Sequence, residues 1–528
     1  MHKATTMVAL NDLPDEIILG IASLVRVRQS PNHLLFLSAG DVTIAEDLSP
    51  EREGLKSFSM VNRRIRRIVL TTWYSVIQLH GDSDGMLKMA QLLRTFRENS
   101  QAAAAVRQLY VCMDPISHEF TSDFLKHNEE VATIYETARS VGILFPTSLF
   151  PAWDDLDYWG KTLLKRADDP KGSTDFEVYD HSDSEDILIT QESIRREAEF
   201  GLFGNLFQIL LLHTAGLREL IAAVPYNAWL PISIDPFAGG QRGNSNIPAY
   251  DARRLLPKLT TLALRPVEEF VEHGLNASVI ATLLAIGPNI KELYLESCLL
   301  LTEFWPLKTL KNITHLTLSM TRVSASQLRV IVGACEALST FKYTPCSDKE
   351  LFFGAKPVEP GEVIQTLLPH AATLKTLCLE YFDTDPHVFI TKPAGQLRQF
   401  TKLENLWIDG FSACGSFGRL SKNNSENDLE NRGPRTVYFL QVFLESLPSS
   451  LETFHWSDEL FDDMEYLEWI FEKLERFPKL RLVEIQCDAG EDDMPVVWRV
   501  RRALVKAGIE SPLYGEMATN AEIWDKDF

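Results

Sequence analysis

One short pattern recurs along most of this chain of 528 residues. Each copy reads apolar-x-x-apolar-x-apolar, and several copies follow a helical stripe and a turn, as in "ASVIATLLAIGPNIKELYLES" and "SASQLRVIVGACEALSTFKY". The ten copies begin at Val106, Leu217, Leu259, Ile290, Ile313, Leu338, Leu374, Leu403, Leu451 and Leu480. From the second copy on, neighbours are 23 to 48 residues apart. This regular alternation of helix, turn and strand indicates a repeat architecture.

The repeats predict an α/β fold with parallel strands. A single unit cannot bury both its helical stripe and its strand, so neighbouring units must stack to form a continuous core. We therefore expect a solenoid in which parallel strands line a concave face and helices line a convex face. An ordinary α/β domain has the same local pattern and is the alternative, although such a sheet seldom needs ten strands.

The polar strand positions are the candidate contacts for a partner. Side chains alternate along a strand, so residues between and just after the apolar positions should point away from the core. Exposed Trp and Tyr side chains are typical anchors of protein interfaces. The alternative is that these side chains simply face solvent. The candidates are Tyr294, Glu296, Thr317, Ser319, Lys342, Glu380, Trp407, Asp409, His455 and Ser457.

A different pattern occupies the first 80 residues and predicts two or three short helices. In the first stretch, apolar residues recur at helical spacing at Ile17, Ile18, Ile21 and Leu24. The second stretch repeats the spacing with Leu55, Phe58, Val61, Ile65 and Ile68, and places arginines on its other face. So few apolar positions make a poor independent core, and such a unit needs a neighbour to cover it.

The residue order of this N-terminal segment resembles the F-box, a helical module that docks the Skp adaptor of cullin–RING ubiquitin ligases. The matching stretches are "LNDLPDEIILGIASLV", "LKSFSMVNRRIRRIV" and "TTWYSVIQLH". The family joins its first two helices by a shorter segment than residues 26–54 provide, so we interpret this segment as an inserted loop. A generic N-terminal helical cap is the alternative. The resemblance implies that the adaptor-binding residues are Leu13, Pro14, Glu16, Ile17, Ile18, Ile21, Leu24, Leu55, Phe58, Val61, Asn62, Arg63 and Trp73.

The downstream repeats resemble the irregular leucine-rich repeats that follow F-boxes. We therefore expect three parts: an F-box domain at 8–80, a leucine-rich-repeat-like solenoid at 81–490 and a C-terminal cap at 491–528. The cap should contain a helix over 494–507 that turns Leu504 and Val505 inward. Stretches with few apolar residues predict insertions in the solenoid near 145–190, 226–250 and 411–435.

Composition and motifs argue against several functional classes. The formal net charge of −21 disfavours nucleic-acid binding, which requires a basic surface. No run of about eighteen apolar residues is present, so we expect no membrane span. There is no P-loop, GxSxG or HExxH motif, so we expect no enzyme activity, no cofactor and no catalytic or metal-binding residues. Seven cysteines without a CxxC pair suggest reduced thiols in a cytoplasmic or nuclear protein.

The resemblance implies a function. An F-box protein with leucine-rich repeats is a substrate-recognition subunit of an SCF-type ubiquitin ligase. Its F-box binds the Skp-type adaptor, and through it the cullin, while its repeats bind a substrate protein that the sequence leaves unidentified. Such a subunit performs no bond chemistry and acts by proximity. The alternative is an F-box/leucine-rich-repeat scaffold that works outside the ligase, and the long insertion at 26–54 is its best support.

Overall fold

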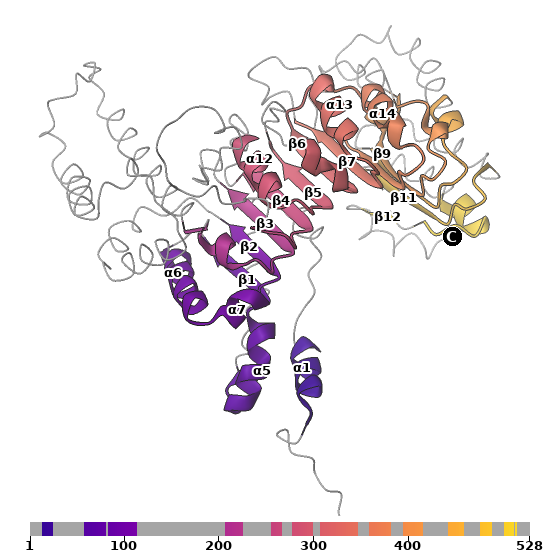
Figure 1. Cartoon of the computed structure of the whole chain (residues 1–528). Coiled ribbons are helices and arrows are strands. Elements are labelled where there is room, and N and C mark those ends of the chain that lie inside the picture. Colours follow the sequence, from indigo (N-terminus) through magenta and orange to yellow (C-terminus); the bar gives the residue numbers. More distant parts are fainter. Residues whose placement is uncertain are drawn as a thin grey trace, which may run out of the picture. The chain divides into compact units, whose positions relative to one another are not determined.

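The computed structural model (Figure 1) describes fourteen segments of the chain. They are residues 13–24, 57–80, 83–112, 206–207, 209–224, 255–266, 277–298, 307–346, 358–381, 394–414, 442–458, 476–487, 501–511 and 513–514. The predicted insertions at 26–54, 145–190 and 226–250 lie outside these segments, as does most of 411–435. The chain divides into two compact units, Met1–Glu269 with Ser278–Asn289 and Phe270–Ala277 with Ile290–Phe528. Each unit is described by itself.

The first unit contains a helix pair formed by α1 (Asp15–Leu24) and α5 (Arg63–Trp73). Helix α1 starts directly after Pro14, whose carbonyl accepts hydrogen bonds from the amides of Ile17 and Ile18. Asp15 and Glu16 occupy the first turn of α1, where negative charge is favourable. Helix α5 starts at Asn62, whose side chain accepts a 2.8 Å hydrogen bond from the amide of Ile65. Proline before the first turn and an asparagine N-cap explain why both helices begin where they do.

The first unit also contains four parallel strands that pair in chain order. These are β1 (Val76–His80), β2 (Gln108–Cys112), β3 (Glu219–Val224) and β4 (Thr261–Pro266). Strand β1 lies within residues 8–80, for which the sequence predicted helices alone. Two helices follow β1, α6 (Ser83–Glu98) and α7 (Ser100–Ala105). The break occurs because Asn99 caps α7 through hydrogen bonds to its first amides.

The second unit contains eight parallel strands that pair in chain order (Figure 1). Strands β2 to β11 coincide with the ten copies of the sequence pattern, so the predicted α/β class with parallel strands is confirmed. The strands of this unit are β5 (Glu292–Glu296), β6 (His315–Thr321), β7 (Thr340–Pro345), β8 (Thr376–Leu379), β9 (Asn405–Asp409), β10 (Thr453–Asp458), β11 (Leu482–Cys487) and β12 (Leu513–Tyr514).

Short helices precede or follow these strands. Helix α13 begins with a capping box between Ser324 and Gln327, and α14 begins with a proline. The pattern's three apolar positions are buried in the nine repeats from β2 to β10, as at Leu374, Leu377 and Leu379, whereas Leu480 before β11 is half-buried. Helices of this unit include η4 (Leu307–Asn312), α13 (Ala325–Ala334), α14 (Pro360–Leu367), η6 (Leu368–His370), η7 (Leu397–Gln399) and α15 (Gly410–Cys414), the last within the insertion predicted at 411–435. Helix α12 (Ala277–Ile286) lies almost entirely in the first unit.

A repeated hydrogen-bond arrangement fixes the register at the start of the strands. The amides of Lys375 and Thr376 both donate to the carbonyl of Ser339, at 2.8 and 3.0 Å. The amides of Glu404 and Asn405 donate in the same way to the carbonyl of Lys375. The same arrangement occurs at every described junction within a unit from β1 to β11. Each repeat therefore sets the position of the next one.

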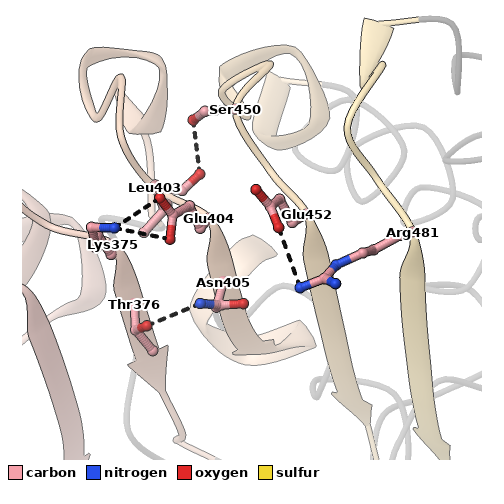
Figure 2. A network of polar contacts seen from close by, with 8 residues as sticks. All are labelled: Lys375, Thr376, Leu403, Glu404, Asn405, Ser450, Glu452 and Arg481. Atoms are coloured by element: carbon pink, nitrogen blue, oxygen red, sulfur yellow. Dashed lines mark hydrogen bonds and ion pairs between the residues drawn. The ribbon is translucent and has the colours of Figure 1, made fainter.

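Side chains add a second layer of contacts at this edge of strands β8 to β11 (Figure 2). Lys375 Nζ lies 3.1 Å from Glu404 Oε1, and Asn405 Nδ2 donates to Thr376 Oγ1 at 3.1 Å. Arg481 pairs with Glu452 at 3.3 Å. Exposed ion pairs of this kind contribute little stability, so the backbone arrangement carries most of the register.

The C-terminal segment differs from its prediction in two ways. Residues 501–506 are helical and Leu504 is fully buried, but Val505 is exposed rather than inward. The error has a simple cause, because adjacent helical residues point about 100° apart. In addition, this segment supplies strand β12, in which Leu513 pairs with Ile485 of β11. The predicted cap therefore extends the sheet as well as covering it.

Candidate functional site

The helix pair divides the predicted adaptor-binding residues between a small core and a surface. Its core is Ile18 and Ala22 of α1 against Ile65 and Val69 of α5, all fully buried. Leu13, Phe58, Ile68 and Trp73 pack around this core and remain partly exposed. Pro14, Glu16 and Arg63 are exposed, and Ile21 and Asn62 are half-buried. Leu55 and the side chain of Leu24 lie outside the described part.

Four large apolar side chains of this helix pair are exposed. Their exposed fractions are 51% for Ile17, 40% for Leu19, 73% for Met60 and 56% for Val61. The sequence placed Ile17 with Ile18 on one broad apolar face and Val61 with Ile65 on another. Of these four, only Ile18 and Ile65 are buried in the structure, because adjacent helical residues point about 100° apart and Val61 precedes α5. We call Ile17, Leu19, Met60 and Val61 the exposed apolar set.

An arginine joins the two helices. Arg64 Nε donates to Asp15 Oδ1 at 3.0 Å, and Arg64 Nη2 donates to the carbonyl of Leu13 at 2.8 Å. Arg64 therefore links α5 to the N-terminal turn of α1, although the sequence placed all four arginines of this helix on an outward face. Arg63, Arg66 and Arg67 are exposed as predicted.

A second candidate site lies on the strands of the second unit. Strand register places one residue of each strand in a single row, in the order Tyr294, Thr317, Lys342, Cys378, Trp407, His455 and Glu484. We call this row and the residues bonded to it the ladder face. Five predicted contacts are in the row itself. Glu296 and Ser319 pair in the next row, as do Asp409 and Ser457.

A buried ion pair lies at the centre of the ladder face. Lys342 Nζ is 2.9 Å from Glu380 Oε2, with side chains only 15% and 11% exposed. Glu380 Oε2 also accepts a 3.1 Å hydrogen bond from Thr344 Oγ1. On its other side, Lys342 Nζ lies 6.0 Å from the centre of the Trp407 ring. The ammonium group is thus held between a carboxylate and an aromatic face, both of which favour a positive charge.

The Trp407 ring stacks on His455, with ring centres 3.5 Å apart and planes 20° from parallel. His455 Nδ1 lies 2.9 Å from Glu484 Oε2. Burial lowers the pKa of His455, although Glu484 acts in the opposite direction, so the imidazole is neutral at pH 7. A neutral ring that donates from Nδ1 to a carboxylate presents a lone pair at Nε2.

On the adjacent strands β9 and β10, three polar atoms are buried without a hydrogen-bond partner. They are Trp407 Nε1, His455 Nε2 and Ser457 Oγ. Buried polar groups in native proteins are nearly always hydrogen-bonded, because an unsatisfied group keeps its full desolvation cost. The three atoms therefore mark a place where hydrogen bonds remain to be made.

Asp409, which the sequence predicted to point away from the core as a candidate partner contact, is buried and has a structural role. Its side chain is 2% exposed, and it accepts hydrogen bonds from the amides of Tyr381 and Ser412. Burial nevertheless raises the pKa of Asp409 to about 6. Four other predicted contacts are also buried: Glu380, His455, Ser457 and Tyr294. Strands lie about 4.8 Å apart, so large side chains in adjacent strands cover one another.

The sequence interpretation missed Thr344, Cys378 and Glu484. Cys378 and Glu484 occupy the fifth position of the same six-residue pattern that gave Trp407 and His455. Aligning the ten copies by that position would have found both. Thr344 directly follows the pattern, at the position that gave Glu380 and Ser457, so the same alignment would have found it as well.

Other chemistry has little support in the part of the chain that the structure describes. There, no group of three His, Cys, Asp or Glu side chains could hold a metal ion, and no helix is long and apolar enough to cross a membrane. Cys112, Cys298, Cys335, Cys346 and Cys378 are free thiols. Comparison with protein-family models gives no match to this chain, and comparison with curated proteins gives none either.

Proposed function

We propose that this protein is a substrate-recognition subunit of an SCF-type ubiquitin ligase. In this proposal the helix pair is the F-box and binds a Skp-type adaptor, through which the cullin is recruited. The parallel-strand repeats are an irregular leucine-rich-repeat solenoid with the ladder face on its concave side, and that face holds the substrate protein. The protein works in the cytoplasm or nucleus, without a cofactor and without contacting nucleic acid or membrane.

The observation that carries the proposal is the exposed apolar set on the helix pair. Two helices with a four-residue core leave Ile17, Leu19, Met60 and Val61 largely uncovered. Exposed groups of large apolar side chains commonly mark protein interfaces. Burying one such side chain completely contributes about 1.5–3 kcal/mol, so covering four half-exposed ones supports a stable complex.

The helix pair is also attached to the elements that follow it in its own unit. The ring of Tyr74, just after α5, packs edge-on against Phe96 of α6 with centres 6.1 Å apart. The carbonyl of Ser75 accepts hydrogen bonds from Arg107 and Gln108 at the start of β2. In the proposed mechanism, one chain that carries both binding surfaces keeps a bound substrate near the ligase at high effective concentration.

The adaptor-binding role can be tested with charge substitutions in the exposed apolar set. We expect Ile17→Lys and Val61→Lys each to weaken binding of a purified Skp adaptor at least tenfold by titration calorimetry, because the lysine cannot be buried without a partner. Val330→Lys is the matched control, since Val330 is an exposed valine on α13 in the other unit. Unchanged adaptor affinity in both helix-pair variants would refute the assignment.

The second candidate is an adaptor-binding scaffold that does not recruit the cullin. The 26–54 insertion between the two helices favours it, because additional chain beside the docking helices can obstruct a larger assembly. Adding purified cullin to the adaptor complex distinguishes the two. A ternary complex supports the ligase subunit, and an adaptor complex that excludes the cullin supports the scaffold.

A further inference from the structure

The ladder face carries an excess of negative charge. On the side of the sheet that the row faces, strands β5 to β11 carry Glu292, Glu296 and Glu484, and Glu380 directly follows β8. Lys342 is the single lysine or arginine on these seven strands, and Glu380 pairs with it. A partner with positive charge is therefore complementary to this face, whereas an acidic partner is repelled.

Hydrogen-bonding atoms without a partner lie among these negatively charged side chains. His455 is 6% exposed and Ser457 is 9% exposed, and His455 Nε2 and Ser457 Oγ have no partner. The adjacent Trp407 Nε1 is also buried and unpaired. These unpaired atoms are a second line of evidence, separate from the negative charge, that a ligand binds here.

The chemistry of the three atoms narrows the ligand class. The indole N–H can only donate, so it requires an acceptor such as a carbonyl oxygen. With its Nδ1 bonded to Glu484, neutral His455 accepts at Nε2 and requires an N–H donor, and the hydroxyl of Ser457 can do either. A polypeptide backbone supplies both kinds of group. Lysine or arginine side chains add the charge that matches Glu484 and the aromatic surfaces that attract cations.

We propose that the ladder face binds a basic, lysine- or arginine-bearing segment of its partner protein, anchored at Trp407, His455 and Ser457. This inference rests on the proposed function, in that the ladder face is the substrate-binding face, and it names the class of substrate segment. The partner's backbone makes the missing hydrogen bonds, and its basic side chains lie near Glu484 and the other strand carboxylates.

The test uses the full-length chain and a displayed library of random dodecapeptides. We expect the selected peptides to be enriched in Lys and Arg. A fluorescein-labelled copy of the strongest binder is then titrated in an anisotropy assay. Trp407→Phe, which keeps an aromatic ring, and Ser457→Ala should each weaken binding about fivefold, the effect of losing one hydrogen bond. Glu484→Gln should weaken it more, because it removes charge and alters the His455 partner.

Glu336→Gln is the matched control, because it removes the same charge from an exposed position beyond α13. Its affinity should stay within twofold of the parent chain. An acidic or uncharged consensus, no enrichment at all, or an equal loss in Glu336→Gln would overturn the inference. Thermal melting by circular dichroism should show all four variants folded like the parent, since none changes the size of a core side chain greatly.

Adaptor binding by the same variants separates this inference from the proposed function. If the peptides bind as expected but the chain never binds a Skp adaptor, the ligase role fails and the basic-segment site stands. If the adaptor binds normally but the peptide results fail, the site assignment is wrong and the ligase role stands.

Discussion

The helix pair and the ladder face use opposite strategies. The helix pair buries four apolar side chains and leaves four other large ones exposed. The ladder face instead buries charged and polar groups, including the Lys342–Glu380 pair and the stacked His455. An apolar surface provides affinity with little selectivity, whereas buried hydrogen-bonding groups discriminate strongly between ligands. The comparison therefore suggests that one region docks a constant partner and the other selects a particular one.

The largest expected effect comes from breaking the buried ion pair. Lys342→Met leaves the Glu380 carboxylate buried without its cationic partner, and we expect it to lower the free energy of unfolding by about 3–5 kcal/mol. Lys375→Met removes the exposed pair with Glu404 and should cost less than about 1 kcal/mol. Urea melts measure both. Equal losses would show that the ladder face is no more strongly bonded than an ordinary surface.

Replacing both members of the pair sharpens this prediction. Lys342→Met combined with Glu380→Met removes the uncompensated charge, so the double variant should recover much of the stability that Lys342→Met loses. If the double variant is less stable than either single variant, the pair is not the source of the effect.

A smaller effect should appear as a dependence of stability on pH. The folded-state pKa of Asp409, about 6, lies above its unfolded value of 3.8, so the folded protein binds the extra proton between these values. The contribution is therefore complete below about pH 4 and is lost as the pH rises through 6, by about 3 kcal/mol. Asp409→Asn cannot titrate. The parent's stability relative to this variant should fall between pH 4 and 7, and a rise would contradict the assigned direction.

The smallest effect concerns the helix pair. Asn62→Ala removes the N-cap bond to Ile65 and should cost about 1 kcal/mol of local stability. Because the exposed apolar set depends on the position of α5, adaptor affinity should fall modestly, by less than in Ile17→Lys. Asn62→Asp, which can still cap, is the control and should stay close to the parent in a calorimetric titration.

The sequence predicted the repeated part of this fold much better than its edges. Each internal strand follows the same apolar positions, because each repeat must bury the same side chains against its neighbours. Strand β1 follows α5 after only two residues and has no helical stripe of its own, and β12 is two residues long, so neither has the full pattern. The spacing of apolar residues alone therefore could not identify strands β1 and β12.

The site was predictable in position but not in environment. Alternation along the strands correctly placed Lys342, Trp407 and His455 in one row. It could not show that His455 stacks on Trp407 or that Asp409 is buried, since these depend on side chains from strands separated by up to 48 residues in sequence. In the helix pair, helical spacing alone could not decide whether Ile17 or Ile18 faces inward.

The most direct test of the account is co-expression of the full chain with a Skp adaptor, followed by size-exclusion chromatography. We expect a stoichiometric complex that elutes as one peak. Ile17→Lys should disrupt this complex, and Val330→Lys should not. A folded chain that elutes apart from the adaptor would contradict the central claim that the helix pair is an adaptor-binding F-box.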